Sequence, residues 1–70
     1  MDMIRIGKRI KELRMERGLS QEKMGEILSV SQDTISLWEK GKSVPTAEYL
    51  IEMAKQFEVS VDYILCLQDY

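Results

Sequence analysis

The sequence contains no histidine and only one cysteine, Cys66, among its 70 residues. A lone cysteine cannot form an internal disulfide, and without histidine the chain lacks the usual four nitrogen and sulfur ligands of a zinc site. The sequence also has no glycine-rich phosphate loop and no nucleophile paired with a histidine base. These absences argue against an enzyme, and we expect neither a metal nor any other cofactor.

Long apolar runs are missing as well. No stretch approaches the roughly 20 apolar residues that cross a bilayer, and the first residues lack the apolar core and cleavage site of a secretory signal. We therefore expect a cytoplasmic protein with no membrane partner. Its length fits one small domain, residues 1–70, for which oligomerisation would add useful stability.

The charge of the chain is low but unevenly distributed. Ten basic and 12 acidic residues give a net charge of −2, whereas strongly basic composition is typical of nucleic-acid binders. From Glu48 onward Lys55 is the only basic residue. Six of the ten basic residues lie in the first 17 positions: Arg5, Lys8, Arg9, Lys11, Arg14 and Arg17. The molecule is therefore predicted to have a basic end and an acidic end.

Four positions carry the pattern of a capped helix start. In each, a Ser or Thr follows an apolar residue or proline, and another apolar residue comes four positions later. The hydroxyl can then accept from a first-turn N–H while the flanking apolar groups fix the entry angle. The four caps are Ser20, Ser31, Thr46 and Ser60. Gly18 and Gly41 each follow a basic residue and indicate helix ends.

Caps and apolar spacing together predict five helices and no strand. The helices are expected at about residues 4–17, 21–28, 32–40, 47–56 and 61–67. The fourth should bury one face composed of Ala47, Leu50, Ile51, Ala54 and Phe57. The predicted fold class is therefore all-α, a compact five-helix domain.

The caps at Ser20 and Ser31 are close enough to define a two-helix unit at about residues 20–40. Each helix is too short to be stable alone, so the two must cross and share a core that includes Ile35 and Trp38. The opposite face of the second helix then carries Gln32, Asp33, Ser36, Leu37 and Lys40. Gln can bond adenine, Ser any base, Asp the amino group of cytosine, and Leu can contact a thymine methyl.

The same region resembles the Cro/C1-type, or XRE, family of helix-turn-helix regulators. The resemblance is carried by residues 19–25, by the run Ser-x-x-Thr-Ile-Ser-x-Trp-Glu-x-Gly at 31–41, and by Pro45 and Thr46. It continues through Leu50, Ala54 and residues 59–65, so that it covers about residues 5–66. The resemblance implies a lambda-repressor-like DNA-binding domain whose second unit helix reads the major groove.

The resemblance also implies roles for individual positions. The base-reading residues would be Gln32, Asp33, Ser36 and Leu37, and the phosphate-binding residues Gln21, Thr34, Lys40, Lys42 and, from the basic N-terminal run, Arg9. Arg14 and Glu39 match the positions of a family ion pair. The alternative is that these polar and charged residues are ordinary solvated surface.

This sequence departs from the family pattern at two points. Ser29 stands where the turn commonly has glycine, and a positive φ there would cost on the order of 1 kcal/mol. Asp33 and Leu37 stand where arginine or lysine is frequent, so the operator sequence cannot be carried over from the family.

The functional prediction is a transcriptional regulator, of repressor type, that binds double-stranded operator DNA. One module buries little surface, so we expect a homodimer on a pseudo-palindromic site with half-sites about 34 Å apart. Residues 61–70 are the candidate dimer contact, because Ile64, Leu65, Leu67 and Tyr70 exceed what a last helix needs. The alternative is a protein-interaction module, such as an antitoxin or regulator subunit, whose acidic second half binds a protein partner.

Overall fold

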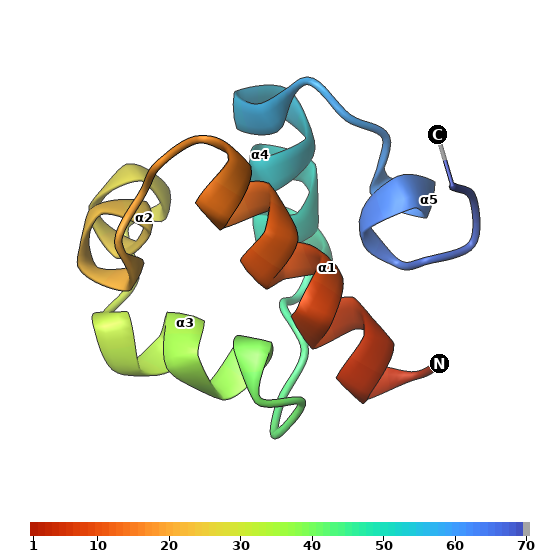
Figure 1. Cartoon of the computed structure of the whole chain (residues 1–70), viewed down its shortest axis with the longest axis horizontal. Coiled ribbons are helices and arrows are strands. Elements are labelled where there is room, and N and C mark those ends of the chain that lie inside the picture. Colours follow the sequence, from red (N-terminus) through yellow and green to blue (C-terminus); the bar gives the residue numbers. More distant parts are fainter. Residues whose placement is uncertain (70) are drawn as a thin grey trace.

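The computed structural model describes residues 1–69, and Tyr70 lies outside the described residues. All regular structure in this part of the chain is helical. The helices, in chain order, are α1 (Met3–Glu16), α2 (Gln21–Leu28), α3 (Gln32–Glu39), α4 (Ala47–Phe57) and α5 (Val61–Ile64). Figure 1 shows α1 running diagonally through the domain, with α2 and α3 on one side of it and α5 on the other. The predicted all-α, five-helix architecture is confirmed.

The helix starts follow the predicted caps. The hydroxyls of Ser20, Ser31 and Ser60 accept from the backbone N–H three residues on, at 3.0–3.1 Å. Thr46 occupies the corresponding position before α4 but forms no side-chain bond there. α1 begins instead with Asp2, whose carboxylate accepts from two first-turn N–H groups at 3.1 Å. This cap is a carboxylate, so the hydroxyl pattern of the other helix starts does not indicate it.

The left-handed residues that end helices in this fold are glycine at some positions and other residues at others. Gly18 and Gly41 take left-handed φ values of 65° and 73° as predicted, but Ser29, Glu58 and Cys66 also take φ values of 60°, 55° and 62°. A side chain with a Cβ is strained in this region because the Cβ approaches the following carbonyl. Three turns of this fold therefore carry a local conformational cost.

The fifth helix is shorter than predicted. It ends at Ile64, and the chain turns there because the N–H groups of Cys66 and Leu67 bond back to the carbonyls of Tyr63 and Asp62 at 3.1 and 2.9 Å. This is the hydrogen-bond arrangement that closes many helices, and it needs a left-handed residue at position 66. The expected helix over 61–67 is thus wrong beyond Ile64.

The core lies between α1 and the four other helices. Its buried members are Ile6, Ile10, Leu13, Met24, Leu28, Ile35, Trp38, Leu50, Met53, Phe57 and Ile64. The face predicted for α4 is rotated from the observed one: Met53 is fully buried, whereas Ile51 is 50% exposed and Ala47 is also exposed. In the part of the chain described here, no helix is both long and apolar enough to traverse a bilayer.

Three arginines, two in α1 and one directly after it, bind the elements that pack against α1. Arg9 donates to the carbonyl of Tyr63 at 2.7 Å, and its guanidinium lies 4.0 Å from the centre of that ring. Arg17 donates to the carbonyl of Phe57 and lies over its ring at 4.9 Å. Both bonds satisfy carbonyls at or near the ends of α5 and α4, where helices leave acceptors without intrahelical partners.

The third arginine, Arg14, pairs with Glu39 at the end of α3, and the predicted ion pair is confirmed. Its Nε and Nη2 donate to the two carboxylate oxygens at 2.6 and 3.0 Å, and Nη1 donates to the carbonyl of Leu19 at 2.8 Å. The Glu39 side chain is only 4% exposed. The hydrogen bonds to Glu39, aided by its charge and opposed by burial, raise the pKa of Arg14 above its ordinary value.

Replacing Ser29 by glycine should stabilise the protein, because glycine adopts φ 60° without the Cβ penalty. We expect a gain of about 1 kcal/mol, or roughly 4–8 °C in Tm for a domain of this size, measured by circular dichroism melts. Ser43→Gly is the control, since Ser43 does not have a positive φ and should gain nothing. Equal melting shifts in the two variants would contradict the strain at Ser29.

Replacing Glu39 by alanine should lower the free energy of unfolding by about 3–5 kcal/mol, because the charge of Arg14 then stays largely buried without its partner. Urea unfolding measures the loss. The matched control is Glu26→Ala, which removes one half of the exposed Lys23–Glu26 pair at 4.0 Å and should change stability little. A comparable loss in both variants would show that the buried Arg14–Glu39 pair stabilises the fold no more than an exposed pair does.

Candidate nucleic-acid interface

The turn between α2 and α3 is closed by backbone contacts that leave no room for a side chain at Gly25. The N–H of Val30 donates to the carbonyl of Gly25 at 2.9 Å. A Cβ at Gly25 would lie 2.6 Å from the carbonyl oxygen of Val30, well inside contact distance. The two helices thus approach closely at Gly25, and this contact fixes the direction in which α3 leaves the turn.

The inner face of α3 is buried as predicted. Ile35 is fully buried and Trp38 is 3% exposed, with its ring 5.7 Å from that of Tyr49 in a tilted arrangement. Met24 and Leu28 of α2 belong to the same core. These contacts leave α3 little freedom to rotate about its axis, so its outer face points in one direction.

The outer face of α3 carries the residues predicted to read bases. Gln32, Asp33, Leu37 and Lys40 are exposed and Ser36 is half-buried. At 3.6 residues per turn these positions fall on one side of the helix. Within residues 1–69 none of the side chains of Gln32, Asp33, Ser36 or Leu37 forms a hydrogen bond or an ion pair, so all four are available to a ligand.

Thr34 lies at the edge of this face and takes part in the helix cap. Its hydroxyl is 3.0 Å from that of Ser31, and its N–H donates to Ser31 Oγ at 3.1 Å. The Thr34 side chain is therefore held at the amino end of α3, where backbone N–H groups give a positive potential suited to an anion.

Gln21 at the start of α2 is tied to the ion pair at the end of α3. Its Nε2 donates to Glu39 Oε1 at 3.1 Å, so the carboxylate joins α1, α2 and α3. A carboxamide nitrogen has two N–H donors, and this bond uses one. The second donor stays at the N-terminal end of α2, where the helix dipole also favours a phosphate oxygen.

The loop after α3 supplies two further predicted residues, Lys40 and Lys42, and both are exposed. Their backbone N–H groups bond to the carbonyls of Ser36 and Leu37 at 3.0 Å. This arrangement places the two ammonium groups directly after the outer face of α3.

Arg9 is the one predicted phosphate-binding residue that the structure holds elsewhere. Its side chain is 14% exposed and lies against α5 and the tail, with Glu12 Oε2 at 3.5 Å and Asp69 Oδ1 at 3.7 Å. α5 lies across α1 from α3 (Figure 1). The structure therefore does not bring Arg9 to the surface formed by α2 and α3.

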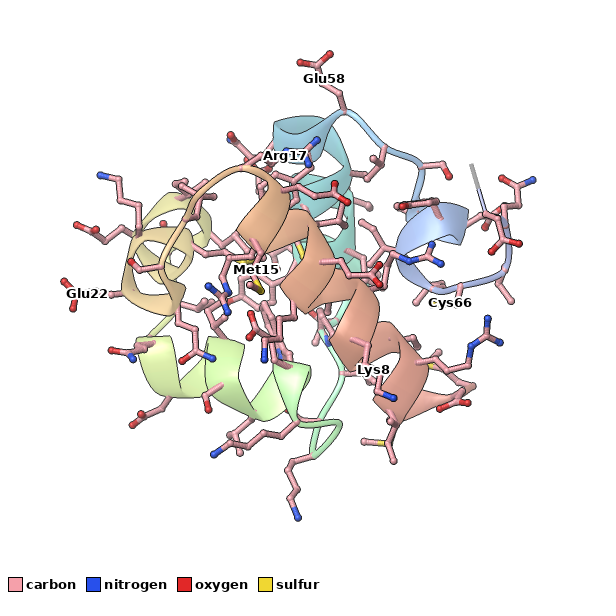
Figure 2. The ribbon with its side chains drawn as sticks, in the orientation of Figure 1. Lys8, Met15, Arg17, Glu22, Glu58 and Cys66 are labelled. Atoms are coloured by element: carbon pink, nitrogen blue, oxygen red, sulfur yellow. The ribbon has the colours of Figure 1, made fainter. Side chains whose placement is uncertain are left out.

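One lysine of α1, Lys11, lies closer to that surface. Gly7 packs against the last turn of α3, where an added Cβ would lie 2.8 Å from the carbonyl oxygen of Glu39. Lys11 lies one turn further along, between Gly7 and Arg14 on the same side of α1, whereas Lys8 borders a hollow that Arg9 and Cys66 also line. Both lysines are exposed, and Figure 2 shows Lys8 projecting from the surface of α1. The sequence showed the basic run but not which of its members lie beside α3.

Among residues 1–69 there is no group of three or more His, Cys, Asp or Glu side chains able to hold a metal. Glu58 projects from the end of the domain opposite α3, near Arg17 (Figure 2).

Comparison with known proteins places the chain in a family. A family model described as helix-turn-helix matches residues 10–64. The HTH-type transcriptional regulator YgzD of Bacillus subtilis is 34% identical over 61 residues, which are 87% of this chain and 92% of YgzD. The repressor protein C2 of Salmonella phage P22 is 33% identical over 60 residues, which are 86% of this chain but 28% of C2. The chain spans most of YgzD and just over a quarter of C2.

Comparison with solved structures also finds helix-turn-helix regulators. The P22 c2 repressor in complex with a synthetic operator superposes with a TM-score of 0.79 at 32% identity, over 84% of this chain and 89% of that one. The restriction-modification controller protein C.AhdI from Aeromonas hydrophila has a TM-score of 0.81 at 22% identity, over 90% and 91% of the two chains, and shows the same fold. With its helix-turn-helix geometry, its matched family model and these relatives, the chain belongs to the Cro/C1-type (XRE) family of helix-turn-helix regulators.

Proposed function

We propose that this protein is a sequence-specific transcriptional regulator that binds double-stranded DNA with α3 in the major groove. The observation that carries the proposal is the division of α3: Ile35 and Trp38 are fixed in the core, while the side chains of the opposite face form no hydrogen bond or ion pair with residues 1–69. A helix presented in this way fits the major groove. The membership of the family and the operator complex of the P22 c2 repressor support it.

The residues of the surface divide into two groups by their chemistry. Those proposed to read base edges are Gln32, Asp33, Ser36 and Leu37. Those proposed to hold phosphates are Gln21, Thr34, Lys40 and Lys42, together with Lys11 of α1. The first group determines sequence and the second determines position and most of the affinity. Arg9 is left out of the second group, because it holds the C-terminal segment.

We further propose that the protein acts as a homodimer of repressor type on a pseudo-palindromic operator, with half-sites about 34 Å apart. The proposed contact is the C-terminal segment. Leu67 is 71% exposed there, and it lines a cavity of about 400 Å³ together with Met1, Leu65 and Cys66. Ile64 is fully buried within the monomer and so does not belong to this contact, and Tyr70 lies outside the described residues.

Binding to mixed-sequence duplex DNA should weaken steeply with salt, because each phosphate contact releases counterions. Fluorescence anisotropy across a salt series measures the slope of log K against log salt. Lys40→Ala and Lys42→Ala should each reduce that slope by about one unit, whereas Lys55→Ala on α4 should not. A wild-type affinity that does not change with salt would instead favour a protein-interaction module.

Gln32→Ala and Ser36→Ala should each weaken binding to a selected operator by roughly 1–3 kcal/mol if they remove a good base contact. Binding to random duplex and the melting temperature should change little, because neither side chain forms a hydrogen bond in the part of the chain that the structure describes. Gln56→Ala on α4 is the matched control and should bind as wild type. Operator affinity that survived both α3 substitutions would refute the proposed base-reading role.

A further inference from the structure

Leu37 is an exposed apolar residue with polar neighbours. It is 45% exposed, the one large hydrophobic side chain of α2 and α3 that is exposed among the described residues. Its neighbours on the same face are Asp33, Ser36 and Lys40. A protein partner normally buries a contiguous apolar patch, and the outer face of α3 around Leu37 is polar. Leu37 is better suited to contact a ligand that presents a single small apolar group among polar groups.

Asp33 lies one turn before Leu37 and further restricts the kind of ligand that this face can bind. A carboxylate only accepts hydrogen bonds, and Asp33 has no partner in residues 1–69. In the major groove the available donors are the amino groups of cytosine and adenine, whereas guanine presents two acceptors. The negative charge is also repelled by phosphates, so Asp33 has a favourable place only against an amino group of a base.

The spacing of the two side chains matches neighbouring base pairs. Residues four apart on a helix have Cβ atoms about 5–6 Å apart, and rotation about the side-chain bonds can shorten or lengthen the distance between the two side-chain ends. Stacked bases are about 3.4 Å apart along the duplex axis. A helix lying along the groove can therefore place the carboxylate and the leucine on adjacent base pairs.

We propose, on the basis of the DNA-binding function above, that Asp33 and Leu37 together read one dinucleotide step. Asp33 accepts from the amino group of a cytosine or adenine, and Leu37 packs against the 5-methyl group of the adjacent thymine. The pair excludes guanine from the position that faces Asp33. The usual arginine-to-guanine contact cannot be made at these two positions, which gives the protein an operator preference of its own.

The test starts from duplexes enriched by repeated selection on the wild-type protein. Each thymine of the enriched site is replaced in turn by deoxyuridine, which lacks only the 5-methyl group. Affinities of wild type and Leu37→Ala for each pair of duplexes form a double-mutant cycle. Ile51→Ala is the matched control, because Ile51 is an exposed aliphatic residue of similar exposure, 50%, on α4.

At one thymine per half-site, wild type and Ile51→Ala should bind the deoxyuridine duplex about fourfold more weakly, the equivalent of about 0.8 kcal/mol for one buried methyl group. Leu37→Ala should bind both duplexes equally. Asp33→Asn should accept guanine at the adjacent position, because the amide adds donors. If no thymine shows this coupling, or if the enriched sites carry guanine at that position, the proposal is wrong.

The outcomes separate this proposal from the function on which it rests. If selection enriches no sequence at all, sequence-specific DNA binding itself fails. If an operator is found and Gln32→Ala weakens its binding, but thymine and deoxyuridine bind alike everywhere, DNA binding stands and the reading by Asp33 and Leu37 is overturned.

Discussion

Three helices meet at one buried carboxylate. Glu39 receives hydrogen bonds from Arg14 of α1 and Gln21 of α2 while it ends α3, so the position of each helix depends on the other two. A charge removed from water is stable only when it is well paired and hydrogen-bonded. Here the pairing joins α1, α2 and α3. The same contact therefore sets both the internal geometry of the domain and the position of Gln21, the proposed phosphate donor.

Local chemistry made much of the fold predictable. Hydroxyl caps and the apolar spacing give five helices with boundaries within one residue for four of them. The misjudged parts are those decided by packing between distant segments. The apolar pattern of α4 allows two orientations of the helix about its axis, because Leu50, Ala54 and Phe57 face the core in both. Contact with the other helices selects the orientation that also buries Met53. The end of α5 depends on Cys66 adopting a conformation that its residue type disfavours, which no local pattern indicates.

The site shows a similar division. The outer face of α3 could be predicted because burying Ile35 and Trp38 leaves only one side of a short helix, and the Arg14–Glu39 pair followed from the family resemblance. The basic run of α1 could not be assigned from sequence, because charge counting does not say which way a side chain points. Gly7 is the clue in hindsight: a residue without a side chain marks the side of α1 that packs on α3, and Arg9 lies on a different side, where it holds the C-terminal segment.

The lack of internal partners for Gln32, Asp33, Ser36 and Leu37 has an evolutionary consequence. Because these side chains contribute almost nothing to folding, substitutions there are tolerated by the scaffold whatever they do to recognition. A lineage carrying this domain can therefore acquire a new operator by a few point mutations without compensating changes elsewhere. Duplicated copies could diverge into regulators of separate genes while the buried contacts behind α3 remain the same.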